Sequence, residues 1–186
     1  MPGVKFQLDA FIDECRRAGS QQAIKEVVAR AVSDRAAVLH ELGEPTKGQV
    51  QTLYHSEDLT ILNLIWAPKM TLFPHDHTVW AVIGIYGGRE DNIFWRRRSG
   101  TETGRVEAVG AKSLSDGDTV ALGRDVIHSV TNPIPRCTGA IHVYGGDFFN
   151  PNRKEWDPET LCERPTDVNR LVRIFEEENA RWEAAR

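Results

Sequence analysis

Between residues 49 and 149 the chain consists of short apolar runs rich in Val, Ile, Tyr, Phe and Trp, separated by Gly, Pro, Asn and Asp. Short runs of this composition with turn residues between them are typical of β-strands. The pattern predicts strands at 49–55, 59–66, 70–73, 76–86, 90–98, 105–114, 118–122, 126–131 and 138–144. Because no helical pattern separates these strands, we expect an antiparallel sandwich or barrel.

Helical spacing appears at both ends of the chain. Between residues 4 and 43, apolar residues recur at helical intervals, and Ser20, Ser33 and Gly43 have the residue types of helix caps. After a polar, irregular stretch, Thr166 can cap a final helix. We expect the apolar stripe of that helix to pack on the core; it consists of Val168, Leu171, Val172, Phe175 and Trp182.

The length of 186 residues fits a single domain that can bury a core without disulfides. We expect residues 1–46 to form a helical cover, residues 47–149 the β-sheet part, and residues 150–186 a loop and the C-terminal helix. A hydrophobic content of 40% and a charged content of 27% are ordinary for a soluble globular protein.

Charge and cysteine usage exclude several classes of partner. The formal net charge of -4 argues against nucleic-acid binding through a broad basic surface, and the run Arg96-Arg97-Arg98 is interpreted as a solvated strand edge. Three scattered cysteines do not form the pattern of a disulfide framework and favour a reducing compartment. No apolar run approaches the roughly 20 residues that cross a bilayer, and the N-terminus lacks the apolar segment of a signal peptide. We expect a cytoplasmic monomer or homodimer without nucleic-acid or membrane partners.

The strongest chemical signal lies in residues 73–78, which read FPHDHT. In an extended chain, side chains two positions apart share a face, so His75 and His77 project to one side. The same face would continue inward as Val79, Ala81, Ile83 and Ile85. His128 lies in a later strand pattern and can complete a set of three imidazoles, which are the commonest metal ligands. The sequence therefore predicts a metal site at the mouth of a packed interior.

These residues resemble the two motifs of the cupin superfamily, whose members have the double-stranded β-helix or jelly-roll fold. The first motif is matched at His75 and His77, with Ala81 where that motif usually has a glutamate. The second is matched around His128. The resemblance implies a mainly β protein, an antiparallel double-stranded β-helix with N-terminal helices and a C-terminal helix.

A three-histidine site without the glutamate is similar to that of the thiol dioxygenases, the cupins that include cysteine dioxygenase and 3-mercaptopropionate dioxygenase. The resemblance covers about residues 49–153 and includes Trp66. The Ser-His-Tyr triad of that family is matched by Ala140, His142 and Tyr144, so its serine is missing. His142 and Tyr144 alternate onto one face of a strand, where the imidazole can hydrogen-bond the phenol. A water would then have to orient His142.

The resemblance also indicates how a substrate carboxylate is held. The arginine that anchors cysteine falls at Gln51, as in the bacterial mercaptopropionate-type enzymes, in which a second arginine matches Arg153. A guanidinium can hold a carboxylate through two parallel hydrogen bonds. An ordinary exposed loop arginine is the alternative interpretation of Arg153, and Arg89 is a weaker candidate anchor. His40 and His55 have no motif around them, and we expect no metal at either.

The function implied by this resemblance is the Fe(II)-dependent oxidation of a small thiol carboxylate, similar to 3-mercaptopropionate or cysteine, to its sulfinate with O2. The implied roles are metal binding by His75, His77 and His128, catalysis by Tyr144 and His142, and substrate binding by Arg153 and Gln51. Histidine ligands also suit Zn, Ni, Mn or Co, so a purified sample can carry another ion. Two alternatives remain open: another metal-dependent cupin enzyme, such as an isomerase or a ring-cleaving dioxygenase, and a non-catalytic metal or ligand sensor.

Overall fold

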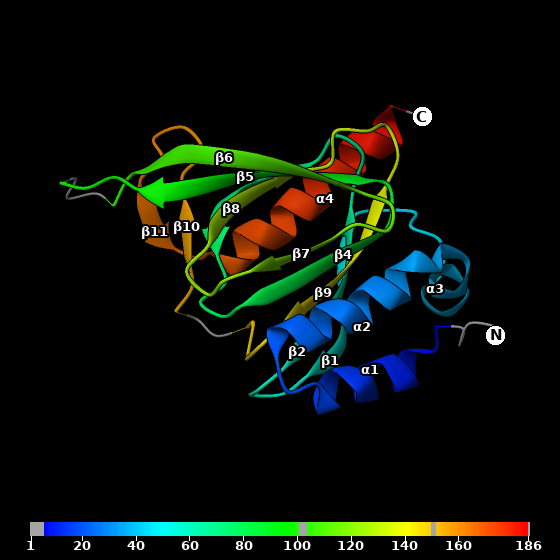
Figure 1. Ribbon diagram of the computed structural model, residues 1–186. Coiled ribbons are helices and arrows are strands. Elements are labelled where there is room, and N and C mark those ends of the chain that lie inside the picture. Colours follow the sequence, from blue (N-terminus) through cyan, green and yellow to red (C-terminus); the bar gives the residue numbers. More distant parts are fainter. Residues whose placement is uncertain (1–5, 101–103, 150–151, 186) are drawn as a thin grey trace.

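The computed structural model describes residues 6–100, 104–149 and 152–185. Helices open and close the chain (Figure 1): α1 spans Leu8–Arg17, α2 Gln21–Ser33, α3 Arg35–Leu42 and α4 Val168–Ala184. The strands between them are β1 (Gln49–His55), β2 (Thr60–Trp66), β3 (Thr71–Asp76), β4 (Ala81–Gly87), β5 (Arg89–Arg97), β6 (Val106–Ser115), β7 (Thr119–Leu122), β8 (Ile127–Thr131), β9 (Thr138–Tyr144), β10 (Lys154–Trp156) and β11 (Glu163–Pro165).

The described strands form two antiparallel sheets. The five-stranded sheet has the order β1-β2-β9-β4-β7, and the six-stranded sheet has the order β11-β10-β3-β8-β5-β6. Strands that follow each other in the chain often belong to different sheets, as β3 and β4 do, so the chain passes repeatedly from one sheet to the other. This is the arrangement of a jelly roll. The predicted antiparallel double-stranded β-helix with helices at both ends is confirmed.

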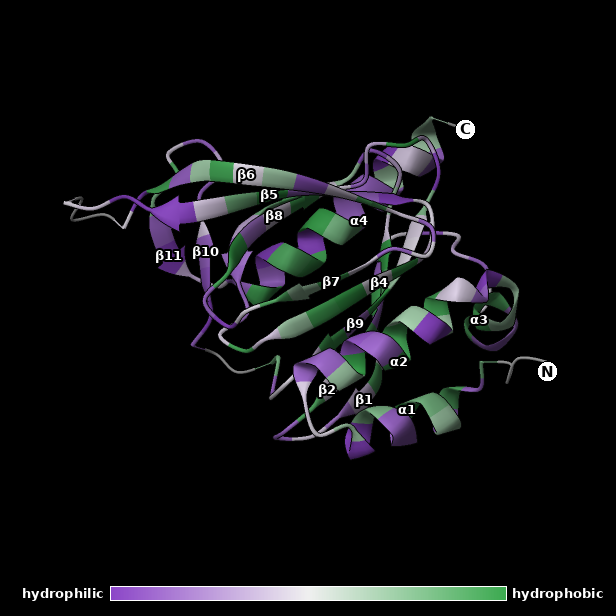
Figure 2. Ribbon diagram, in the orientation of Figure 1, coloured by the Kyte–Doolittle hydropathy of each residue, from purple (hydrophilic) through white to green (hydrophobic). Residues whose placement is uncertain are grey.

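Apolar side chains pack on both faces of the five-stranded sheet. On β4, Ala81, Ile83 and Ile85 face the six-stranded sheet, whereas Val82 faces α1, α2 and α3. The central strands β4 and β9 are buried along their whole length and contain mostly apolar residues (Figure 2). One face of this sheet therefore closes the interior of the jelly roll, and the other carries the N-terminal helices.

The predicted strand at 76–86 is wrong in one respect that matters for the site. β3 continues to Asp76, and β4 begins only at Ala81 in the opposite sheet. The reversal occurs at Thr78, whose φ of 60° is unusual for a β-branched residue. The stretch from 150 to 165, which we expected to be irregular, contains β10 and β11, because three-residue strands are too short to show an alternating pattern.

Two of the predicted helix caps are confirmed. Ser20 accepts a hydrogen bond from the N–H of Ala23, and Gly43 ends α3 with a φ of 81°. The other two are displaced by one residue, because Asp34 and Asp167 supply the capping oxygen in place of Ser33 and Thr166. A carboxylate is as good an N-cap as a hydroxyl, so the residue type alone does not locate the helix start.

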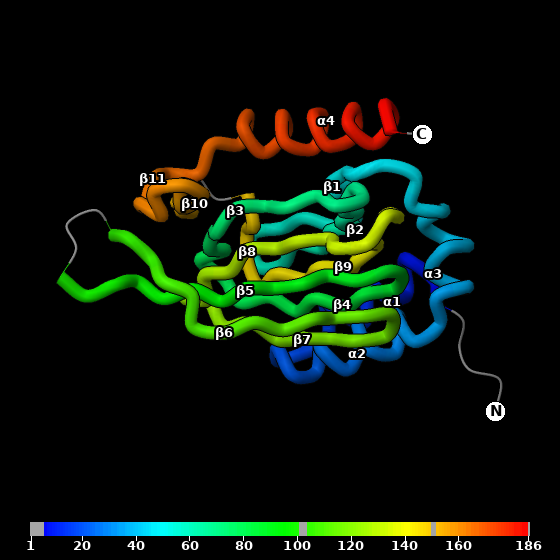
Figure 3. The backbone as a smooth tube through the Cα atoms, turned by 90° about the horizontal axis from the view of Figure 1, so that it is seen from above, coloured from blue at the N-terminus to red at the C-terminus, as the bar shows by residue number. Residues whose placement is uncertain are grey.

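The C-terminal helix α4 runs beside β1 and β3 along the open side of the jelly roll (Figure 3). Leu171 and Phe175 contact the interior, but no residue of α4 is buried, and Val168 and Val172 remain 65% and 52% exposed. The expectation that the whole stripe packs on the core is therefore wrong. Among the described helices, none has the length and apolar character that crossing a bilayer requires.

Candidate metal centre and the cavity around it

The local sequence of β3 explains how its histidine reaches the interior. The pairing of β3 with β8 shifts register between Leu72 and His75, around Pro74, which has no N–H to donate to a neighbouring strand. His77 lies just after β3, at the start of the reversal at Thr78. The side chain of Asp76 points the other way and accepts a hydrogen bond from the N–H of Lys154.

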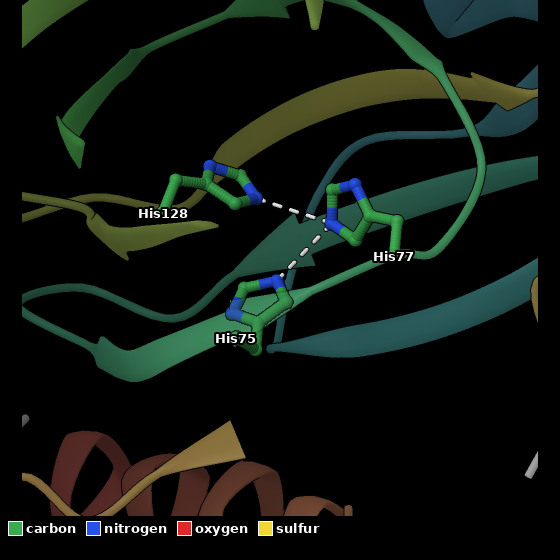
Figure 4. Close-up of side chains that lie close together, drawn as sticks. All are labelled: His75, His77 and His128. Carbon is green, nitrogen blue, oxygen red and sulfur yellow. Dashed lines mark hydrogen bonds between the residues drawn. The ribbon is translucent and has the colours of Figure 1, made fainter. Parts of the chain in front are cut away.

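The structure brings His75, His77 and His128 together (Figure 4). Their ligand nitrogens lie within 4.8 Å of one another. The Nε2 atom of His77 is 3.2 Å from Nε2 of His75 and 3.1 Å from Nε2 of His128. Although the two first histidines are not in one continuous strand, the reversal after β3 still turns both rings inward. The arrangement provides three nitrogen ligands on one side of a common point, which suits a transition metal.

Hydrogen bonds to the outer nitrogens determine which ring atoms carry protons. The Nδ1 atom of His75 is 3.0 Å from the backbone oxygen of Phe73, which can only accept, so Nδ1 is protonated and Nε2 has a free lone pair. The Nδ1 atom of His128 is 2.7 Å from Oδ1 of Asn92. The amide nitrogen of Asn92 donates to a carboxylate oxygen of Glu90 over 2.9 Å, so its oxygen faces His128. Two Nε2 lone pairs are thereby directed at the metal position, as metal-ligating histidines require.

Burial keeps these imidazoles neutral. Burial lowers the pKa of His75 to about 4, and the pKa values of His77 and His128 also lie well below 6.5, chiefly because of burial and then because of neighbouring imidazoles. The same neutral form that burial favours is the form that binds metal. The residues present therefore fit a bound divalent ion, and no described carboxylate belongs to the cluster.

A second polar group lies beside this cluster, on β9. The phenolic oxygen of Tyr144 is 2.9 Å from Nδ1 of His142, as predicted, and the Tyr144 ring contacts His77 edge-on with ring centres 5.0 Å apart. Burial raises the pKa of Tyr144 above its usual value, so the phenol stays protonated. The Nε2 atom of His142 faces Glu90 over 3.7 Å and has no hydrogen-bond partner among the described residues.

Glu90 is the residue that sequence reasoning missed. It is fully buried on β5, and its two oxygens accept hydrogen bonds from Trp66 (2.7 Å) and Asn92 (2.9 Å). Burial raises its pKa, but His142, Asn92 and Trp66 outweigh that effect, so the pKa of Glu90 is lower than usual. The carboxylate of Glu90 lies 3.7 Å from Nε2 of His142, beyond hydrogen-bond distance, so the expectation that a water orients His142 stays a prediction. The sequence signal was a charged side chain at an inward position of β5, with Asn92 on the same face.

The second predicted anchor, Arg153, lies at this site and is not an exposed loop residue. It is 7% exposed, its guanidinium lies 4.0 Å above the ring of Phe148, and it donates a hydrogen bond to the backbone oxygen of Phe148. The Phe148 ring stacks on Tyr144 with centres 4.1 Å apart. No carboxylate of the described residues forms an ion pair with Arg153. Asp76 and Glu155 act on its charge only from beyond ion-pair distance, so this buried cation is suited to an anionic ligand.

The remaining predicted residues lie elsewhere. Gln51 pairs with Asn63 across β1 and β2 and accepts a hydrogen bond from its amide, whereas its neighbours Val50 and Thr52 line the cavity. Its side chain therefore faces away from the histidines and cannot hold a substrate carboxylate there. Arg89 forms an exposed ion pair with Asp91.

No family model matches the chain. Solved structures similar to it include a cupin protein with a double-stranded β-helix fold from Methanocaldococcus jannaschii, with a TM-score of 0.47 and 13% identity over 58% of this chain and 87% of that chain. The DMSP lyase DddQ from Ruegeria pomeroyi has a TM-score of 0.47 and 16% identity over 61% of this chain and 53% of that chain. Oxalate decarboxylase from Bacillus subtilis has a TM-score of 0.42 and 19% identity over 56% of this chain and 27% of that chain.

A cavity of about 740 Å³ opens next to the histidines. His75, His77 and His128 line it together with Tyr144 and Arg153. Strands β1 and β2 provide one wall, β3 and β8 of the other sheet face them, and α4, which runs beside β1 and β3, covers the remaining side (Figure 3). The site can therefore receive a small molecule directly beside the predicted metal position.

Proposed function

We propose that this protein is a non-haem Fe(II) dioxygenase that converts a thiol carboxylate to its sulfinate. In the overall reaction RSH + O2 → RSO2⁻ + H⁺, both oxygen atoms enter the product and the sulfur loses the electrons that O2 gains. When bound, Fe(II) supplies the centre at which a thiolate and O2 react. Three neutral ligands leave the full charge of the ion uncompensated, which favours an anionic thiolate.

The observation that carries this proposal is the position of Arg153 beside a three-histidine cluster. The buried guanidinium shares the cavity with the imidazoles and lacks a carboxylate partner among the described residues. A substrate carboxylate at Arg153 would satisfy that charge through paired hydrogen bonds. The same contact would hold the sulfur end of a short thiol acid at the histidines. An amine thiol without a carboxylate lacks this interaction.

Tyr144, His142 and Glu90 can take up the proton of the thiol. If the Nε2 hydrogen of His142 faces Glu90, Nδ1 accepts the phenolic hydrogen of Tyr144. The phenolic oxygen can then take the thiol proton while Tyr144 passes its own proton to Nδ1. The imidazolium that forms lies 3.7 Å from the buried carboxylate of Glu90, which stabilises it.

The test is oxygen uptake by protein loaded with Fe(II) under anaerobic conditions, with sulfinate confirmed by mass. The thiols are 3-mercaptopropionate, cysteine, mercaptosuccinate and cysteamine. We expect uptake with a carboxylate thiol and little with cysteamine. If iron is fully bound and none of the four thiols causes oxygen uptake, the proposal is refuted, and another cupin chemistry or a sensor is favoured.

Two variants separate metal binding from turnover. His128→Ala removes one ligand and should abolish both iron binding and oxygen uptake. Tyr144→Phe leaves the three imidazoles in place, so iron content should stay at the wild-type level while kcat falls about 100- to 10,000-fold, the usual contribution of a positioned acid or base. Unchanged iron content in His128→Ala would show that the ligand assignment is wrong.

A further inference from the structure

The cavity is much larger than the reaction centre needs. Its volume of about 740 Å³ lies within the roughly 300–1,000 Å³ typical of pockets that enclose drug-sized ligands. The histidines, Tyr144 and Arg153 occupy one part of its lining. A three-carbon thiol acid held between Arg153 and the histidines would leave most of the space empty.

Most of the remaining lining is apolar. Strand β2 contributes Leu62 and Leu64, the facing sheet contributes Leu72 and Val130, and α4 contributes Leu171 and Phe175. At about 30 Å³ per molecule, roughly 25 waters would fill the whole volume, and water beside such walls lacks hydrogen-bond partners. An apolar group that displaces this water gains affinity.

Polar contacts at two points hold α4 over the cavity. Asn179 forms hydrogen bonds of 2.6 Å and 2.8 Å with the backbone N–H and oxygen of Gly48. Near the start of the helix, Arg170 forms an ion pair of 2.9 Å with the buried Glu155. Val172, between these two attachments, and Val168, just before the first, line the cavity and remain exposed. Exposed apolar residues at a tethered cover are typical of a ligand site.

Charge is unevenly distributed along the lining. The cation of Arg153 lies beside the histidines, whereas Lys47 lies just before β1, and Glu176 and Asn179 lie on α4. A ligand that matches this distribution has an anionic head at Arg153 and an apolar body against β2 and α4. A small thiol that is polar throughout or doubly charged matches this distribution of charged and apolar residues less well.

We infer that the substrate is a thiol carboxylate with a bulky apolar body, an aryl or extended alkyl group, that fills the space between β2 and α4. The inference rests on the proposed function for the sulfur chemistry and goes beyond it in naming the substrate class. The sulfur and carboxylate lie at the histidines and Arg153. The apolar body takes the place of water against Leu62, Leu64 and Phe175.

The decisive comparison uses two thiols with the same spacing between sulfur and carboxylate. These are 3-mercaptopropionate and its 2-benzyl derivative, assayed with the iron-loaded enzyme. We expect kcat/KM for the benzyl compound to be at least tenfold higher, which corresponds to about 1.4 kcal/mol. Turnover of 3-mercaptopropionate with an equal or lower value for the benzyl compound would overturn the inference and leave the proposed function intact.

A matched pair of variants locates the apolar contact. Val172→Asp places a charge in the cavity wall and should lower the ratio of the two kcat/KM values at least fivefold. Val109→Asp is the control, because Val109 on β6 is also 52% exposed and does not line the cavity. The control should leave the ratio unchanged. If Val172→Asp and Val109→Asp give the same ratio of the two kcat/KM values, the apolar body of the substrate does not contact α4.

A binding measurement on metal-free protein separates failure of this inference from failure of the proposed function. The probes are 4-phenylbutyrate and butyrate, which lack a thiol, titrated by calorimetry. We expect 4-phenylbutyrate to bind at least tenfold more tightly and Val172→Asp to remove that difference. If no thiol is oxidised but this preference is found, the apolar site stands and the dioxygenase proposal fails. Equal binding of the two acids would refute the apolar site.

Discussion

Glu90 links the two halves of the site at the scale of single residues. Through Asn92 its carboxylate orients the candidate metal ligand His128, and over 3.7 Å it faces His142, which in turn hydrogen-bonds Tyr144. A fully buried carboxylate is retained only where its partners compensate for lost hydration. The partners here are the groups that would bind metal and move a proton.

We predict that Glu90→Gln weakens both metal binding and turnover. The amide replaces one accepting oxygen with a donor, so it cannot accept hydrogen bonds from both Trp66 and Asn92. We expect metal affinity to fall about 10- to 100-fold, as for other partners of ligating histidines, and kcat to fall as well. Metal titration and turnover at saturating iron measure the two effects. Tyr144→Phe is the comparison, because it should change turnover alone.

The position of Arg153 leads to a prediction about substrate charge. Arg153→Ala should raise KM for 3-mercaptopropionate by about 10- to 100-fold, since a hydrogen bond to a charged group contributes about 1.5–3 kcal/mol. KM for cysteamine should not change, because cysteamine has no carboxylate. Steady-state oxygen consumption with both thiols provides the measurement. An equal rise for both would show that Arg153 supports the fold of the site and does not anchor substrate.

At the scale of elements, α4 is a cover that is attached at separate points. Its interior contacts are made by Leu171, Ile174 and Phe175, and Phe175 stacks on Trp66 with ring centres 5.8 Å apart. Two hydrogen bonds between Asn179 and Gly48, one donated by each residue, attach its C-terminal part to the residues before β1. Few buried apolar contacts make such a helix a low-stability element that can open without global unfolding.

We predict that Asn179→Ala increases opening of α4. Two hydrogen bonds of net value about 0.5–1.5 kcal/mol each are lost, so amide hydrogen exchange in α4 should accelerate roughly five- to 100-fold. Exchange in β4 and β9 should be unaffected, because these strands are buried in the centre of the sheet. Arg173→Ala is the control, since its ion pair with Asp167 is exposed and contributes little. Equal acceleration in both variants would contradict the role of Asn179.

At the scale of the whole molecule, burying the histidines in neutral form makes the metal-free protein sensitive to acid. Burial lowers the pKa of His75 from 6.5 to about 4, so between these pH values the unfolded chain binds a proton that the folded chain does not. The contribution of this difference to the free energy of unfolding is fully present above pH 6.5 and is lost as pH falls toward 4. For His75 alone it amounts to about 3 kcal/mol at about 1.36 kcal/mol per pH unit.

We therefore predict that the melting temperature of chelator-treated protein falls steadily from pH 7 to pH 4.5. The His75→Phe variant should show a smaller fall, because phenylalanine does not titrate. Thermal scans across this range, with circular dichroism at each pH to confirm folding, measure both. Addition of Zn²⁺ at pH 7 should raise the melting temperature of the wild type, since an ion that binds only the folded state stabilises it. A melting temperature independent of pH would contradict neutral burial of the histidines.

Much of the fold and the identity of the three-histidine cluster could be predicted from the sequence alone. Strand positions follow from apolar runs and turn residues, which are local properties of the chain. The three histidines are chemically distinctive, and two of them are neighbours in sequence, so their convergence required only one long-range contact. Pairing of His142 with Tyr144 likewise follows from alternation within a single strand.

Only the tertiary structure decided which groups lie opposite these residues. Alternation shows which side chains of a strand share a face, but it does not show what another strand presents to that face. For this reason Glu90 was not recognised as the carboxylate that faces His142, and Gln51 was assigned to the wrong face of β1. The exposed stripe of α4 has the same origin, because an apolar helix face looks alike whether it contacts a core or covers a cavity. Local sequence thus determined the strands and the residues of the histidine cluster, and long-range packing determined the cavity and its charges.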